Sequence, residues 1–151
     1  MRRRTLLAVL GTGTIGSLAG CLSASLFDDD EPPETRIESI GVGNWEPVDI
    51  SINILITEAG TPVFYRRVDL EGWPPEDNWY PREMLDGYPT EPGDHTLHVW
   101  HEGDDPADGR TFDIRDHSQS CVELDIFVGD LHSYSPTGDI TVGPLSCREP
   151  R

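Results

Sequence analysis

The sequence predicts an all-β protein whose main domain is a sandwich of two sheets with about seven short strands. Three observations lead to this prediction. Apolar residues recur at every second position in several segments, which is the period of a strand with one buried face. Glycine, proline, asparagine and aspartate separate these segments and supply the turns between strands. No segment after residue 34 has the apolar period of a long amphipathic helix.

Two segments carry the strand pattern most clearly. Residues 50–56 place isoleucine at every second position, and residues 122–128 alternate Val, Leu, Ile and Val in the same way. Shorter segments repeat the pattern at residues 63–70, 97–99, 112–114 and 140–142. Near the start of the domain, Ile37 and Ile40 are three positions apart. We therefore expect a bend or a bulge in the first strand.

One segment carries a family resemblance. Residues 92–99 (PGDHTLHV) are similar to the proline-glycine start of a late strand in immunoglobulin-like domains. A tyrosine commonly stands two residues after the glycine in those domains, and His95 occupies this place here. The resemblance implies an immunoglobulin-like two-sheet sandwich. It concerns architecture, so it implies no activity and no cofactor.

Residues 1–20 read as an export signal. Arginines stand at positions 2–4, and the sixteen residues that follow carry no charge. As a helix these sixteen residues would rise about 24 Å, which is less than the roughly 30 Å of a bilayer core. A charged start, a modest apolar segment and small residues at the exit are typical of a cleaved signal rather than of a membrane-spanning helix.

Two motifs within this segment resemble known export signals. The motif formed by Arg3, Arg4, Leu6 and Leu7 resembles the twin-arginine signal. Residues 18–21 (LAGC) resemble a lipobox, in which the cysteine receives lipid and becomes the first mature residue. The resemblance implies a twin-arginine-exported lipoprotein. Cys21 would then hold the chain at the extracytoplasmic face of the cell membrane.

The remaining cysteines fit this interpretation. If Cys21 carries lipid, Cys121 and Cys147 are left as a pair, which is expected to oxidise outside the cytoplasm. A two-cysteine metal site is the alternative, but the close C-x-x-C spacing of such sites is absent. Residues 21–34 then form the lipid-bearing cysteine and an acidic tether, and residues 35–151 form the sandwich domain.

The charge of the chain argues against a nucleic-acid partner and favours an environment of high salt. It has 28 acidic and 11 basic residues, every basic residue is arginine, and the net charge is −17. Without the arginines at positions 2–4, 28 acidic and 8 basic residues give −20. No basic patch exists for nucleic acid. The profile resembles secreted proteins of halophilic archaea, since at molar salt the Debye length of roughly 3 Å suppresses self-repulsion.

Residues 71–91 interrupt the strand pattern and are the candidate binding loop. Their aromatic side chains are Trp73, Trp79, Tyr80 and Tyr88. If these rings are exposed, the loop is expected to bind a glycan or an envelope protein. If they are buried, the loop is expected to cap one end of the sandwich. We expect Trp79 to be buried as the cap and Trp73 to be more exposed. Pro81 and Gly87 predict one helical turn between them.

Catalytic and metal signatures are weak. No G-x-S-x-G elbow is present, and no free cysteine remains after lipidation and pairing, so no enzyme is predicted. The weak metal candidates are His95, His98, His101, Asp104 and Asp108. On a strand, His95 and His101 share one face while His98 points to the other, so the three histidines should not converge.

The sequence therefore predicts a lipid-anchored binding or structural module of the cell envelope, and no feature selects an oligomeric state. A divalent-cation- or copper-binding surface domain is the alternative, and an enzyme comes third.

Overall fold

The structure is a computed structural model that describes residues 35–74, 76, 79–116, 119–130 and 135–147 of the 151 residues. The predictions that fall outside the described residues are the export motif (Arg3, Arg4, Leu6 and Leu7), the lipid-bearing Cys21 and the tether.

The described residues form eight strands and two short 3-10 helices. In chain order these are β1 (Arg36–Asn44), β2 (Ile50–Glu58), β3 (Thr61–Leu70), β4 (Arg82–Met84), β5 (His95–His101), η1 (Pro106–Asp108), β6 (Arg110–Asp113), η2 (Ile114–Asp116), β7 (Cys121–Val128) and β8 (Ile140–Ser146).

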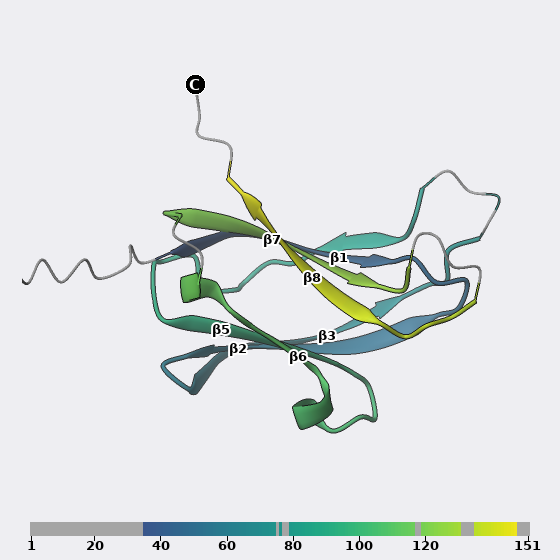
Figure 1. Cartoon of the computed structure of the whole chain (residues 1–151), viewed down its shortest axis with the longest axis horizontal. Helices are drawn as coiled ribbons and strands as arrows, with labels where there is room; N and C mark the ends of the chain where they lie inside the picture. Colours follow the sequence, from purple (N-terminus) through teal and green to yellow (C-terminus); the bar gives the residue numbers. More distant parts are fainter. Residues whose placement is uncertain (1–34, 75, 77–78, 117–118, 131–134, 148–151) are drawn as a thin grey trace, which may run out of the picture.

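Two four-stranded sheets form the two layers of the molecule (Figure 1). Sheet A has the strand order β4-β1-β7-β8, and sheet B has the order β3-β2-β5-β6. Neighbouring strands are antiparallel, except that β1 and β7 run parallel. The predicted all-β sandwich of two sheets is confirmed.

Three details differ from the expectation. The structure has eight strands where about seven are predicted, and β1 pairs with β4 and β7, whereas the immunoglobulin orders are ABED and CFG. The helical turn predicted between Pro81 and Gly87 is wrong, because β4 forms there and pairs with residues 41–43 of β1. This pairing satisfies backbone groups at the edge of β1 that a helical turn would leave without partners.

The core lies between the inner faces of the two sheets. Ile52, Ile54 and Ile56 of β2 are fully buried, as are Leu124 and Ile126 of β7. The predicted alternation of buried and outward positions is therefore confirmed for both segments. Each such side chain contributes about 1.5–3 kcal/mol when it is removed from water.

The predicted irregularity of the first strand is also confirmed. β1 pairs with β7 from Arg36 opposite Cys121 onward, and the register shifts between Ile37 and Ser39. Because of this extra residue, Ile37 and Ile40 both reach the core although they are three positions apart.

The two ends of the sandwich carry different segments (Figure 1). At the proximal end, the described chain starts at Thr35 and both β1 and β7 begin. At the distal end, β1 and β7 terminate and β8 begins. The distal end also carries the described residues of four connections: 45–49, 71–74 with 76 and 79–81, 102–109, and 129–130 with 135–139.

Candidate functional site

The predicted binding loop is divided between the two ends of the sandwich. At the distal end, Trp73 and Tyr80 are half-buried and their ring centroids lie 6.5 Å apart. Trp79 is 68% exposed and contacts no other described residue through a hydrogen bond or its ring. The expected burial of Trp79 and exposure of Trp73 are therefore wrong. The backbone N–H of Trp73 donates to the carbonyl of Glu46 at 2.7 Å, and this bond holds Trp73 against the fold.

Tyr88, the fourth predicted aromatic residue, lies away from the other three. Its hydroxyl donates to the backbone carbonyl of Glu38 at 3.0 Å, and its ring meets Phe64 edge-on. Burial raises the pKa of the Tyr88 phenol above its ordinary value, and the negative charge of Glu38 adds to this shift. Tyr88 therefore has a structural role between β1 and β3.

A distal aromatic cluster, formed by Trp45, Trp73, Tyr80 and Phe127, lies where β1 and β7 end. Trp45 stacks on Phe127 with centroids 4.1 Å apart, and Tyr80 meets both rings edge-on. A Cβ on Gly43 would come within 2.8 Å of Phe127 and 2.9 Å of Tyr80. Sequence reasoning missed Trp45 and Phe127. The available signal was the large aromatic ring of Phe127 at an outward position of its predicted strand.

A buried carboxylate fixes the segments of the distal end. Glu46 is 4% exposed, and its Oε1 accepts from the backbone N–H of Thr137 at 2.7 Å and of Gly138 at 2.6 Å. The side chain of Asn44 accepts from the N–H of Glu46 and donates to the carbonyls of Val48 and Glu71. These bonds join residues 44–48, 71 and 137–138, so the distal end is built as one unit.

The three candidate histidines occupy three different places. His95 is 1% exposed within the core at the proximal end, and its Nδ1 has no hydrogen-bond partner among the described residues. His98 lies on the outer face of sheet B between Thr57 and Thr111. His101 donates from Nε2 to the carbonyl of Gly138 at 2.6 Å. The three histidines therefore do not form one site.

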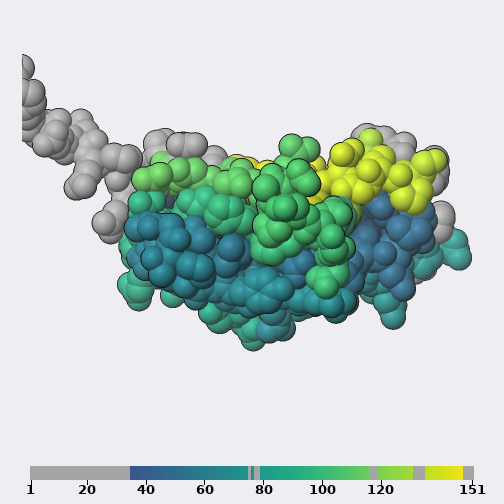
Figure 2. Space-filling model, turned by 90° about the horizontal axis from the view of Figure 1, so that it is seen from below, coloured from purple at the N-terminus to yellow at the C-terminus, as the bar shows by residue number. Residues whose placement is uncertain are grey.

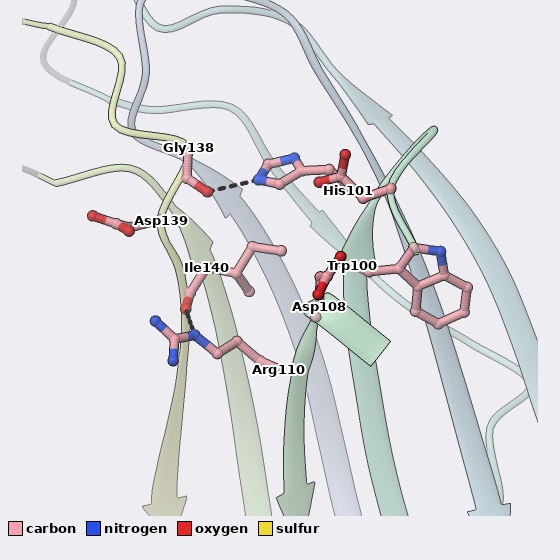
Figure 3. Close-up of a pocket in the computed structure, with 9 residues that line it drawn as sticks. Trp100, His101, Asp108, Arg110, Gly138, Asp139 and Ile140 are labelled. Carbon is pink, nitrogen blue, oxygen red and sulfur yellow. Dashed lines mark hydrogen bonds between the residues drawn. The ribbon is translucent and has the colours of Figure 1, made fainter. Parts of the chain in front are cut away.

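A hollow of about 330 Å³ opens between the ends of β5, β6 and β8 (Figure 3). The residues that line it are Trp100, His101, Asp104, Asp108, Gly109, Arg110, Gly138, Asp139 and Ile140. Figure 2, which views the molecule from the side of sheet B, shows the green residues around η1 and β6 beside the yellow residues of β8. Three of the five weak metal candidates, His101, Asp104 and Asp108, thus share one hollow.

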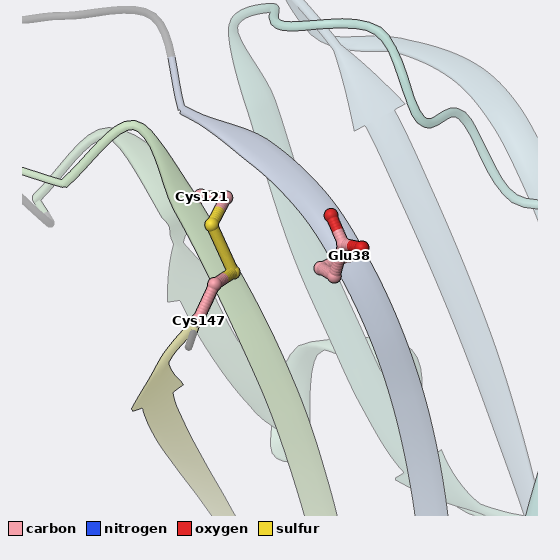
Figure 4. Close-up of side chains that lie close together, drawn as sticks. All are labelled: Glu38, Cys121 and Cys147. Atoms are coloured by element: carbon pink, nitrogen blue, oxygen red, sulfur yellow. A yellow bond between two sulfur atoms is a disulfide. The ribbon is translucent and has the colours of Figure 1, made fainter. Parts of the chain in front are cut away.

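The ligand atoms of these three residues do not all lie within 4.8 Å of one another. Among the described residues, the single set of three His, Cys, Asp or Glu ligand atoms within 4.8 Å of one another is Glu38, Cys121 and Cys147 (Figure 4). Cys121 and Cys147 are joined in a disulfide, as predicted. A disulfide sulfur is not a thiolate, and it therefore lacks the charge with which cysteine binds metals.

A polar network covers the outer face of sheet B. Asn53, at its centre, donates to Glu102 at 2.9 Å, and Arg67 lies 3.3 Å from Glu102. Hydrogen bonds from Ser51 and Arg67 hold the pKa of Asp69 below its ordinary value, and Asp69 raises the pKa of Arg67. Sequence reasoning missed this network, although its β2 residues alternate with the buried isoleucines.

The described residues contain no apolar helix of membrane-spanning length. No family model matches the chain, and neither a curated protein nor a solved structure is significantly similar to it. A functional conclusion therefore rests on the residues of this chain.

Proposed function

We propose that the chain is a lipid-anchored, extracytoplasmic binding module of the cell envelope without catalytic activity. The LAGC motif that ends at Cys21 supports the anchor, and the positions of the two ends of the sandwich support the orientation. A tether of residues 22–34 spans at most about 45 Å, so the domain would stay near the membrane with its distal end turned away.

The observation that carries the binding function is the arrangement of the distal end. Trp79 is 68% exposed, whereas Trp73 and Tyr80 of the same loop pack into the distal aromatic cluster. Glu46 fixes the neighbouring segment through two backbone hydrogen bonds. A displayed indole on an ordered base loses little conformational entropy on binding and can serve as an anchor for a glycan or an envelope protein.

The binding function is tested by capture of purified envelope glycan and envelope protein fractions on the immobilised full chain. Trp79→Ala should weaken capture of one fraction by at least about tenfold, because anchor residues carry most interface energy. Tyr65→Ala is the matched control, since Tyr65 is also an exposed ring, 60% accessible, but lies on sheet B. Equal capture by the parent and Trp79→Ala would contradict the proposal.

The anchor is tested separately in the producing cell. Cys21→Ser should release the protein to the medium or leave an unprocessed precursor. Arg3→Lys combined with Arg4→Lys should block export, since the twin-arginine route reads the arginine pair. Retention of processed Cys21→Ser protein at the membrane would count against lipidation.

Divalent-cation binding is a second candidate, because His101, Asp104 and Asp108 line one hollow. Because the ligand atoms of these residues do not all lie within 4.8 Å of one another, we rank cation binding below the binding-module function. A melting-temperature increase with calcium or copper alone, at fixed molar salt, would favour this candidate.

A further inference from the structure

Among the arginines that the structure describes, one lacks the carboxylate partner that the others have. The structure describes six arginines, and five of them lie within 4.0 Å of a carboxylate: Arg36, Arg66, Arg67, Arg82 and Arg115. Arg110 has no carboxylate within this distance among the described residues. In a chain with 28 acidic residues and a net charge of −17, an unpaired arginine is unexpected.

The fold holds Arg110 in place at the hollow. Arg110 begins β6, and its Nε donates to the carbonyl of Ile140 on β8 at 3.1 Å, which links the edges of the two sheets (Figure 3). This bond uses one of the five N–H donors of the guanidinium. The terminal nitrogens, which form the fork that binds carboxylates in a bidentate manner, have no hydrogen-bond or ion-pair partner among the described residues.

The opposite charge lies in the same hollow. Asp104, Asp108 and Asp139 line it, and none of their carboxylates pairs with an arginine among the described residues. A simple anion would meet Arg110 but would be repelled by the three aspartates. A simple cation would meet the aspartates but would be repelled by the guanidinium. A ligand that carries both charges complements the whole lining.

We propose that this hollow binds a small zwitterion with one carboxylate and one or more ammonium groups, of the class of the basic amino acids. Arg110 donates to the ligand carboxylate, and Asp104, Asp108 and Asp139 accept from the ammonium groups. The lining carries three negative charges and one positive charge, which favours a ligand with two ammonium groups over a neutral zwitterion. This inference goes beyond the proposed function, because it assigns a second binding site that does not include Trp79.

The test is calorimetric titration of the purified full chain, at one fixed salt concentration, with L-lysine and with L-lysinamide. The amide keeps both ammonium groups and lacks the carboxylate. L-lysine should bind saturably with a stoichiometry of one, and L-lysinamide at least about tenfold more weakly, because a charge-assisted bidentate pair is lost. Arg110→Gln should abolish this preference, so that both probes bind equally weakly.

Two further variants complete the design. Arg36→Gln removes the same charge from an exposed pair at the proximal end and should keep the preference of the parent. Asp108→Asn removes a carboxylate that is proposed to accept from the ammonium groups. Because both probes carry these groups, the affinity for both should fall by a similar factor. Melting curves establish that each variant is folded.

Three results would overturn the proposal: no saturable binding of L-lysine in the millimolar range, equal affinity of the parent for acid and amide, or an unchanged preference in Arg110→Gln. The titration requires neither Cys21 nor Trp79. Its failure is therefore distinguishable from a failure of the anchoring or envelope-capture experiments.

Discussion

At the level of single residues, Glu46 differs from most acidic residues of the chain because its carboxylate is buried. In a chain with 28 acidic residues, most are solvated, and the sequence around Glu46 gives no sign of burial. The structure buries Glu46 to 4% exposure and compensates its charge with two backbone N–H groups and the hydroxyl of Thr137. A buried charge is tolerated only with such partners.

Glu46→Ala should lower the free energy of unfolding by about 1–3 kcal/mol for each backbone donor that it leaves without a partner. Glu46→Gln keeps a neutral acceptor and should cost about 1 kcal/mol. Denaturant unfolding measures both variants. Glu91→Ala is the control, because Glu91 is exposed and pairs with no described residue, and its stability should stay within about 0.5 kcal/mol of the parent. Similar losses for Glu46→Ala and Glu91→Ala would contradict the structural role of Glu46.

The lowered pKa of Asp113 predicts how the free energy of unfolding changes at acidic pH. Hydrogen bonds from the side chain of Arg115 hold the pKa of Asp113 below its ordinary value of 3.8, and partial burial opposes this shift. The native state therefore binds fewer protons than the unfolded state in this range. The stabilisation is present above the unfolded pKa and is lost as the pH falls through the lower, folded pKa.

Asp113→Asn should thus show a smaller loss of unfolding free energy than the parent between about pH 6 and about pH 3. Denaturant unfolding at each pH measures it. Asp86→Asn removes an exposed carboxylate that pairs with no described residue, and should keep the slope of the parent. If the free energy of unfolding falls equally with pH in the parent and in Asp113→Asn, Asp113 does not contribute to the acid dependence of stability.

At the level of secondary-structure elements, two glycines of β1 leave space that side chains of neighbouring segments fill. Gly41 and Gly43 lie on the outer face of sheet A, and the rings of Phe127 and Tyr80 lie against Gly43. At Gly41 the closest neighbours are the ends of the Arg82 and Asp125 side chains, which pair with each other. Ring contacts are rigid, whereas the ends of long side chains can shift.

Gly43→Ala should therefore destabilise the domain by about 1–3 kcal/mol, since the new Cβ forces two packed rings apart. Gly41→Ala is the matched control on the same strand and should cost less. Unfolding free energies and the near-ultraviolet circular dichroism of the aromatic cluster measure the difference. A larger loss at Gly41 than at Gly43 would mean that the rings do not rest on the strand.

At the scale of the whole molecule, the disulfide closes the proximal end. Cys121 begins β7, and Cys147 follows β8 at a sequence separation of 26. The bridge fastens the last described residue to the strand that pairs with both β1 and β8. It therefore restrains the C-terminal hairpin beside the point at which the described chain begins.

Combined Cys121→Ser and Cys147→Ser substitution should lower the free energy of unfolding by about 3–4 kcal/mol in the loop-entropy model. Chemical unfolding without reductant measures the loss. Adding reductant to the parent should reproduce it, whereas Cys21→Ser should leave stability unchanged, since this residue precedes the domain. A double variant as stable as the parent would show that the bridge does not stabilise the fold.

Sequence reasoning predicts the fold class, the buried faces of β2 and β7, the irregularity of β1 and the pairing of Cys121 with Cys147. These features follow from local periodicity or from the number of cysteines, so they can be predicted without knowledge of distant contacts. The same reasoning failed for Trp73 and Trp79, because burial within a loop depends on which strand end lies beside it.

Contacts between distant segments of the chain determine which side chains meet at the distal end. Trp45, Tyr80 and Phe127 come from three segments of the chain and join because β1 pairs with β7. Glu46 binds residues 137–138, about ninety positions away. The hollow at Arg110 exists because the edges of β6 and β8 lie together. Sheet order sets these contacts, and no local pattern of residues encodes sheet order.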